Sequence, residues 1–192
     1  MLTHITRATA AALLIAASTA AQADWTLDAG ASRLSFISTK NGSKAETHYF
    51  REISGAVTDN GDARVEVPLD SVETAIPIRN ERMREFLFET ADFPSLTVTA
   101  SVDPALLGTD GAQSGAVPVT VSLHGQEASY EAAVIVARDK DGSLTVATTE
   151  PIVVNAADFE LGAGIAKLRE LAGLDSISTA VPVSARLVFR QD

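Results

Sequence analysis

A cluster of three arginines is the group of charged side chains whose spacing is best suited to binding a ligand. Arg79, Arg82 and Arg84 fall close together in a chain whose formal net charge is −10. In a helix, Arg79 and Arg82 are three positions apart and can lie on one side. One interpretation is an anion clamp, for instance on a phosphate at the mouth of a pocket. The other is a solvated face paired with Glu81 and Glu85, which interleave with the arginines.

Two histidines, His48 and His124, are the remaining candidates for proton transfer or metal binding. His48 would share a strand face with Phe50, and its default role is a satisfied or surface side chain. His124 is expected to be exposed at a hairpin tip. Structural zinc sites usually take four Cys or His ligands, and the chain has no cysteine, so no metal site is expected. A metal-dependent hydrolase would require both histidines to converge with carboxylates in one cleft.

Known catalytic motifs are missing from the sequence. It has no Gly-x-Ser-x-Gly turn, no Ser-x-x-Lys and no Gly-rich phosphate or dinucleotide loop. Paired carboxylates carry no information in so acidic a chain. We therefore expect no catalytic residues, no enzymatic activity and no cofactor.

An apolar cluster follows the arginines directly. It consists of Met83, Phe86, Leu87, Phe88 and Phe93. The ordinary interpretation is hydrophobic core. A lining for a long, flexible hydrocarbon is the alternative, because methionine adapts to irregular shapes.

Short segments with alternating apolar and polar residues make up most of the chain. This period of two is typical of strands with one buried face. Turn sequences such as Asn41-Gly42 and His124-Gly125 separate them. The pattern predicts an up-and-down antiparallel sheet that closes into a barrel or packs as a sandwich. The predicted strands include residues 33–38, 63–69, 96–99, 117–124, 130–136, 144–150 and 181–190.

Two helices are predicted between these strands, over residues 79–88 and 163–172. Gly173 follows the second helix where a left-handed cap would end it. Neither helix is long enough to be stable alone in water. Each must therefore lay its apolar side on the sheet, and in a closed barrel the natural place is an open end.

The N-terminus has the pattern of a secretory signal. Residues 8–20 are uncharged and mostly apolar, and Ala21-Gln22-Ala23 has the form of a cleavage site. The run is shorter than the ~18 residues of a membrane span. We predict a signal peptide over 1–23 and one domain over 24–192, exported without disulfides to a bacterial periplasm. The acidic balance disfavours nucleic-acid binding, and no stable membrane anchor is expected.

Several short motifs carry a family resemblance. They are Trp25-Thr-Leu-Asp, Ser32-Arg-Leu-Ser-Phe, Ile53-Ser-Gly-Ala-Val, Ser71-Val-Glu-Thr, Arg79-Asn-Glu-Arg-Met-Arg with Phe93-Pro, Leu123-His-Gly, and Asn155-Ala-Ala-Asp-Phe. In kind and order they resemble the YceI family, the periplasmic polyisoprenoid-binding, lipocalin-like proteins. The section from Arg79 to Pro94 is the most specific.

The resemblance implies an all-β fold, an extended eight-stranded antiparallel lipocalin-like barrel with two short helices near its openings. It also implies non-catalytic binding, sequestration or transport of a long-chain isoprenoid lipid, such as a polyprenyl phosphate or quinone, in the periplasm. Arg79 and Arg82 are the expected head-group contacts. The expected ligand-binding residues inside the barrel are Phe36, Phe50, Val65, Val67, Met83, Phe86, Phe88, Val98, Val119 and Val134.

The chain departs from the family pattern at polar positions. Members often show Arg-Asp-x-His-Leu-Arg, and this chain has Asn80 and Arg82 where the acid and the histidine stand. Many members have a histidine near the end of the second strand, where this chain has Ser38-Thr-Lys40. If those groups touch a head group, we expect a different head-group preference.

A barrel-shaped interaction module with a solid core and no lipid ligand is the competing hypothesis. Cavity volume discriminates the two, because a continuous apolar tunnel favours lipid and normal packing favours the module. The isoprenoid lipid or quinone is the expected partner. The oligomeric state is left open, with a homodimer as one option.

Overall fold

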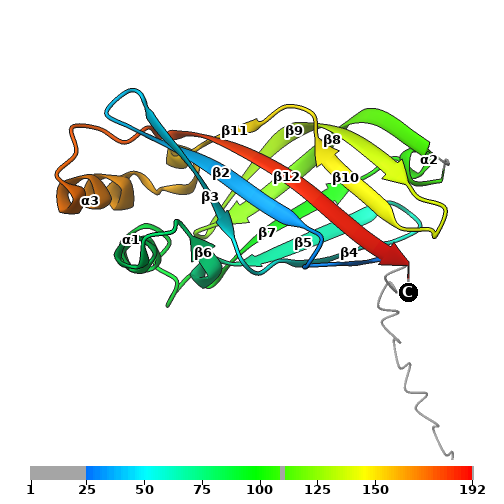
Figure 1. The fold of residues 1–192 in the computed structure, drawn as a ribbon, viewed down its shortest axis with the longest axis horizontal. Coiled ribbons are helices and arrows are strands. Elements are labelled where there is room, and N and C mark those ends of the chain that lie inside the picture. Colours follow the sequence, from blue (N-terminus) through cyan, green and yellow to red (C-terminus); the bar gives the residue numbers. More distant parts are fainter. Residues whose placement is uncertain (1–24, 109–110, 192) are drawn as a thin grey trace, which may run out of the picture.

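The computed structural model describes residues 25–108 and 111–191, and the predicted signal segment 1–23 lies outside them. One antiparallel sheet closes on itself as a barrel (Figure 1). Its ring runs β1-β4-β5-β7-β8-β9-β10-β12 and returns to β1, so the predicted eight-stranded barrel is confirmed. The strands are β1 (Trp25–Leu27), β2 (Arg33–Lys40), β3 (Lys44–Phe50), β4 (Ser54–Val57), β5 (Asp62–Pro68), β6 (Val72–Glu73), β7 (Ser95–Ser101), β8 (Gly111–Leu123), β9 (Gln126–Arg138), β10 (Leu144–Thr148), β11 (Ile152–Asn155) and β12 (Ala180–Gln191).

Strand β12 gives the barrel its length, because it serves two sets of neighbours. Its C-terminal half pairs with β10 and β1, which closes the ring. Its N-terminal half pairs with β11 and β2 instead. Strand β3 then pairs with β2 and with β6, so the wall continues past the closed ring toward the end that carries the longer helices (Figure 1).

Two predicted hairpin turns are confirmed. Asn41 and Gly42, between β2 and β3, have φ values of 49° and 75°. His124 and Gly125, between β8 and β9, have φ values of 53° and 74°. Positive φ at both central residues is the conformation that suits the right-handed twist of paired strands.

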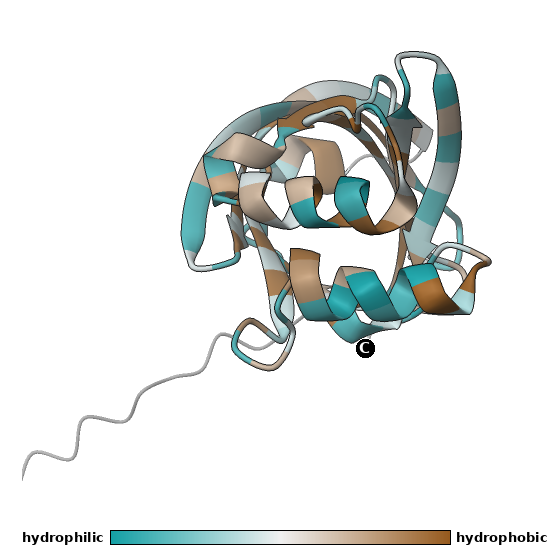
Figure 2. Cartoon of the chain, turned by 90° about the vertical axis from the view of Figure 1, so that its left-hand side faces the viewer, coloured by the Kyte–Doolittle hydropathy of each residue, from teal (hydrophilic) through white to brown (hydrophobic). Residues whose placement is uncertain are grey.

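The helices lie at the two ends of the barrel. Helix α1 (Pro77–Arg82), the following π-helical turn η2 (Met83–Leu87) and helix α3 (Gly162–Ala172) lie across one end (Figure 2). The short helix α2 (Pro104–Leu107), which the sequence did not indicate, lies at the other end (Figure 1). Two short 3-10 turns complete the structure, η1 (Leu69–Ser71) and η3 (Ala156–Phe159).

The predicted helix 79–88 differs from the structure in both position and type. It begins earlier, at Pro77, because proline suits the first helical turn. After Arg82 it widens, and the amide of Phe88 donates to the carbonyl of Met83 at 2.9 Å, five residues back. The second predicted helix is confirmed, and Gly173 ends it with φ of 61°. No helix in the described ranges has the length and apolarity needed to cross a membrane.

Helix α3 packs tightly onto the π turn. A Cβ atom at Gly164 would lie 2.4 Å from the carbonyl oxygen of Phe86 and 2.8 Å from the Cα of Leu87. Both atoms belong to the backbone and cannot give way easily. The absence of a side chain at Gly164 therefore sets how closely the two helical segments approach.

Candidate functional site

An elongated cavity of about 560 Å³ runs inside the barrel, and we call it the bore. This volume lies in the range of small-molecule sites. Leu107 of α2 lines it at one end, and Ile165 and Leu168 of α3 line it at the other. Ile76 and Ile78 also line the bore and are 43% and 51% exposed, so it reaches the surface beside α1.

Alternating residues of the strands supply the apolar wall. On β12 the wall positions are Val181, Val183, Ala185, Leu187 and Phe189, every second residue, as the period of two predicted. Because successive side chains of a strand point to opposite faces, the same alternation sends the arginines of β12 outward. The bore is thus a direct consequence of strand patterning.

Most of the residues predicted to bind ligand lie on the wall of the bore. Their role as ligand contacts stays a prediction. Those on the wall are Phe36, Phe50, Val65, Arg79, Arg82, Met83, Phe88, Val98, Val119 and Val134.

Val67 and Phe86 were also predicted to line the bore, and the structure places them elsewhere. Val67 is completely enclosed by its neighbours, with no exposed surface, and does not reach the bore. Phe86 instead lines a small separate pocket beside α3, together with His124 and Lys167. The wider π turn causes this, because it aligns residues five apart, and Phe88 rather than Phe86 follows Met83 on the inner side.

The sequence analysis missed other wall residues. Helix α3 contributes Ile165 and Leu168, which its amphipathic spacing could have indicated. Leu107 had no such signal, because helix α2 is too short to show a period. His48 also lies on the wall, on the strand face that it was expected to share with Phe50, which could have indicated it.

A charged cluster of Lys40, Glu46 and Arg79 lies beside the β2–β3 hairpin, at one end of the bore. Arg79 donates from Nη1 to Glu46 Oε2 at 2.7 Å and from Nη2 to the Thr74 carbonyl at 2.5 Å. Lys40 forms a second ion pair with Glu46. The hydrogen bond from Lys40, joined by Arg79 and opposed by burial, lowers the pKa of the Glu46 carboxyl to about 2. Arg79 is thus anchored to the β2–β3 hairpin.

The expected partners of the arginines, Glu81 and Glu85, are not the ones observed. Arg82 donates from Nη1 to the carbonyl of Leu171 at 3.2 Å, which links α1 to the end of α3. Arg84 donates from Nε to the carbonyl of Asn80 at 3.2 Å. Residues adjacent in sequence project in different directions from a helix, so the arginines find partners on other elements or on the backbone.

Asn80 has a structural role at the start of α1. It is 5% exposed, and its Oδ1 accepts from the amide of Thr74 at 2.9 Å. Its Nδ2 donates to Glu73 Oε1 at 3.2 Å. An amide can donate to this carboxylate, whereas an ionised aspartate could only repel it. This buried network therefore explains why the chain has an asparagine at position 80, where family members often have an acid.

His48 is buried beside the charged cluster and is 3% exposed. Its ring meets Phe36 edge to face, with centroids 5.4 Å apart. Burial, reinforced by the positive charge of Arg79 and opposed by Glu46, lowers the pKa of His48 to about 4. The ring is therefore neutral at neutral pH.

His124 occupies the predicted turn, but the expectation that its side chain is exposed was wrong. Its ring centroid lies 4.2 Å from that of Phe93, and Nε2 lies 2.8 Å from Glu89 Oε2. The two histidines face different pockets, so they do not share the cleft that a hydrolase would need. Among the described residues, no group of three or more His, Cys, Asp or Glu is placed to hold a metal ion.

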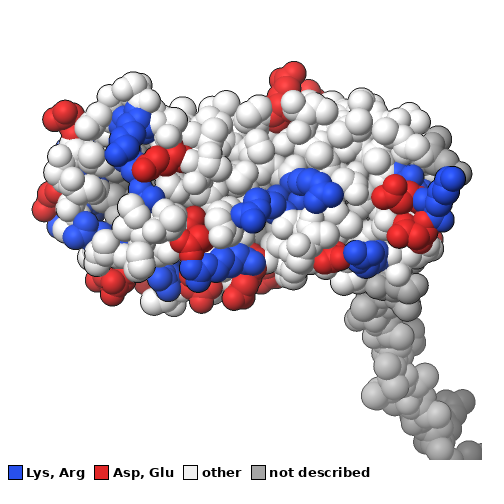
Figure 3. Space-filling model, viewed as in Figure 1, with Lys and Arg blue, Asp and Glu red and all other residues white. Residues whose placement is uncertain are grey.

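Charged residues on the outer surface contrast with those on the bore. On the face shown in Figure 3, basic and acidic side chains are interspersed rather than gathered into patches of one sign. Among the residues that the structure describes, the charged ones on the wall of the bore are cationic: Lys40, Lys44, Arg79 and Arg82. The interior therefore combines a long apolar surface with one polar, basic end.

Comparison with known proteins identifies the fold and the family. The chain is 39% identical to a polyisoprenoid binding domain from Saccharophagus degradans implicated in plant cell wall breakdown; the match covers 89% of this chain and 100% of that one, with a TM-score of 0.85. BcnA of Burkholderia cenocepacia has the same fold at 17% identity, over 84% of this chain and 98% of that one, with a TM-score of 0.68. No curated protein matches the sequence. The YceI-like domain model matches residues 25–189, and the chain therefore belongs to the YceI family.

Proposed function

We propose that this protein binds a long-chain isoprenoid lipid without catalysing a reaction, and that it sequesters or carries the lipid in the periplasm. The elongated apolar bore is the observation that carries the proposal. Its wall continues from α2 at one end of the barrel to α1 and α3 at the other. A slender branched hydrocarbon has the shape and chemistry that such a space accepts.

The family relationship supports this proposal. The Saccharophagus protein, described as a polyisoprenoid binding domain, matches over its full length at 39% identity. The predicted signal segment 1–23 supports export. A barrel with a solid core is not favoured, because a cavity of about 560 Å³ is far from normal packing density.

Burial of the tail supplies the affinity in this proposal. Each buried methylene contributes about 0.8 kcal/mol, so an isoprene unit of about five carbons contributes up to about 4 kcal/mol. Association and chain ordering offset a large part of the total. The cationic residues Arg79 and Arg82 at the polar end then orient the head group.

Native mass spectrometry of protein purified from its own periplasm tests the proposal. We expect a lipid adduct whose mass, after extraction, is that of an isoprenoid. Repeated preparations with no adduct, and no uptake of added isoprenoid by the delipidated protein, would contradict it.

A further inference from the structure

The wall of the bore changes chemistry in steps along the β2–β3 hairpin. On β2 the inward positions run from Phe36 to Ser38 and then to Lys40. On β3 the same direction leads from Phe50 to His48. The wall is therefore apolar, then polar and uncharged, then charged as the hairpin turn is approached.

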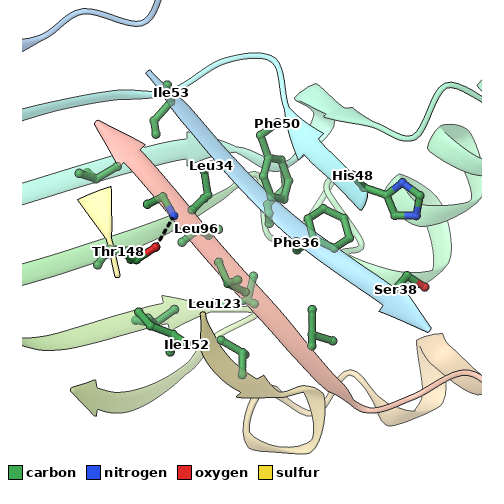
Figure 4. Close-up of a pocket in the computed structure, with 18 of the residues that line it drawn as sticks. Leu34, Phe36, Ser38, His48, Phe50, Ile53, Leu96, Leu123, Thr148 and Ile152 are labelled. Atoms are coloured by element: carbon green, nitrogen blue, oxygen red, sulfur yellow. Dashed lines mark hydrogen bonds between the residues drawn. The ribbon is translucent and has the colours of Figure 1, made fainter. Parts of the chain in front are cut away.

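Ser38 and His48 form the uncharged step. Phe36 pairs with His48 in the sheet, and Ser38 pairs with Glu46. Ser38 is thus the diagonal neighbour of His48 on the same face, within reach across the two strands. Figure 4 shows both side chains on the strands that wall the bore, beyond the rings of Phe36 and Phe50.

His48 brings hydrogen-bonding groups to the wall of the bore. A neutral imidazole has one donor and one acceptor nitrogen. A backbone hydrogen bond with Thr47 can occupy one of these nitrogens. The ring lines the bore and is only 3% exposed, so a ligand atom that bonds to it would be shielded from water.

Arg79 leaves one polar atom unmet at the same end. Its two terminal nitrogens bond to Glu46 and to the carbonyl of Thr74. Its Nε is buried and has no hydrogen-bond partner among the described residues. An unmet donor beside an apolar bore, next to the imidazole of His48, is what a ligand oxygen would satisfy.

We infer that His48 and Ser38 form a head-group subsite inside the bore, which takes an oxygen-bearing head group at the boundary between apolar and charged wall. The inference rests on the proposed isoprenoid binding and goes beyond it by naming the residues that contact the head group. The head-group oxygen is a ring carbonyl or hydroxyl, or a phosphate oxygen. Arg79 Nε is a further donor for it.

The aromatic side chains beyond this subsite set the direction of the tail. The ring centroids of Phe36 and Phe50 lie 5.6 Å apart, and those of Phe50 and Phe88 lie 6.1 Å apart. This row leads away from His48 along the wall of the bore. A head group held at His48 therefore places its first isoprene units against the aromatic row.

Three ligands with the same tetraprenyl tail test the inference by calorimetric titration of delipidated protein. One carries a benzoquinone head, one a monophosphate, and one is a headless hydrocarbon. We expect His48→Phe, which keeps an aromatic ring beside Phe36, to weaken binding of at least one head-bearing ligand about tenfold. Its affinity for the headless hydrocarbon should equal that of the wild type, and the ligand with the larger loss identifies the head group.

Two further variants serve as controls for misfolding and for the general loss of a histidine. His48→Gln keeps a donor and an acceptor and should retain most of the head-bearing affinity, even if His48→Phe folds poorly. His124→Phe, a histidine outside the bore, should change nothing. Equal loss for headed and headless ligands, or no loss for either, would overturn the subsite. Failure of the wild type to bind any of the three would instead overturn the proposed function.

Discussion

Filling the bore with a side chain distinguishes an empty interior from a packed one. Ala132 of β9 is 4% exposed and lies on the wall. Substituting Ala132→Phe adds an aromatic ring at the middle of the strand. In a well-packed core such a change costs about 1–3 kcal/mol of folding stability through strain. In a bore of about 560 Å³ the ring has room, so we expect the free energy of unfolding to stay the same or rise.

The same ring should compete with the lipid tail. It takes the space of about one isoprene unit, whose burial is worth up to about 4 kcal/mol at ~0.8 kcal/mol per methylene. The dissociation constant of a long isoprenoid should therefore rise by up to about 1,000-fold.

Urea unfolding of delipidated protein and calorimetric titration with isoprenoid measure the two effects. Ala116→Phe is the matched control, because Ala116 is exposed on the neighbouring strand β8 and does not line the bore. It should leave lipid affinity unchanged. A loss of stability above about 1 kcal/mol in Ala132→Phe, with lipid binding as in the wild type, would refute the reasoning.

The remaining predictions concern the helical end and pH. Met83→Asp should lower the urea midpoint of unfolding strongly, because it buries an unpaired charge. Arg82→Ala should shift this midpoint little. An unchanged midpoint for Met83→Asp would show that this side chain does not face the interior. Gly164→Val should separate α3 from η2, lowering the melting temperature and speeding lipid exchange; wild-type exchange would contradict the tight contact. The pKa of His48 is 6.5 in the unfolded state and about 4 in the folded state, so between these values the unfolded state binds more protons. The free energy of unfolding should therefore fall by at most about 2 kcal/mol as the pH is lowered from 7 to 5. This slope should vanish in His48→Gln; an identical slope in both proteins would assign it elsewhere.

Local sequence patterns predicted the barrel, because strand alternation and hairpin turns depend on residues that are close together in the chain. The alternation of β12 placed Val183 and Leu187 inward, and the turn at Asn41-Gly42 set one hairpin. These features depend on residues close together in the chain. The helix over 163–172 followed from the same kind of signal, with Gly173 as its cap.

Features that depend on distant partners were not predictable in this way. Arg79 pairs with Glu46, which lies on another element, rather than with a neighbour in its own helix. The π turn shifts Phe86 away from the bore, and a period of 3.6 residues cannot reveal it. The place of His48 on the cavity wall beside Ser38 depends on the register in which its strand pairs with β2, which the sequence did not indicate.

The dependence of affinity on tail length tests the bore most directly. Delipidated protein would be titrated with isoprenoids that share one head group and differ by single isoprene units. The structure predicts that affinity rises with each added unit until the bore is full and then levels off, because tail burial supplies the binding energy. An affinity that does not change with tail length would contradict the account.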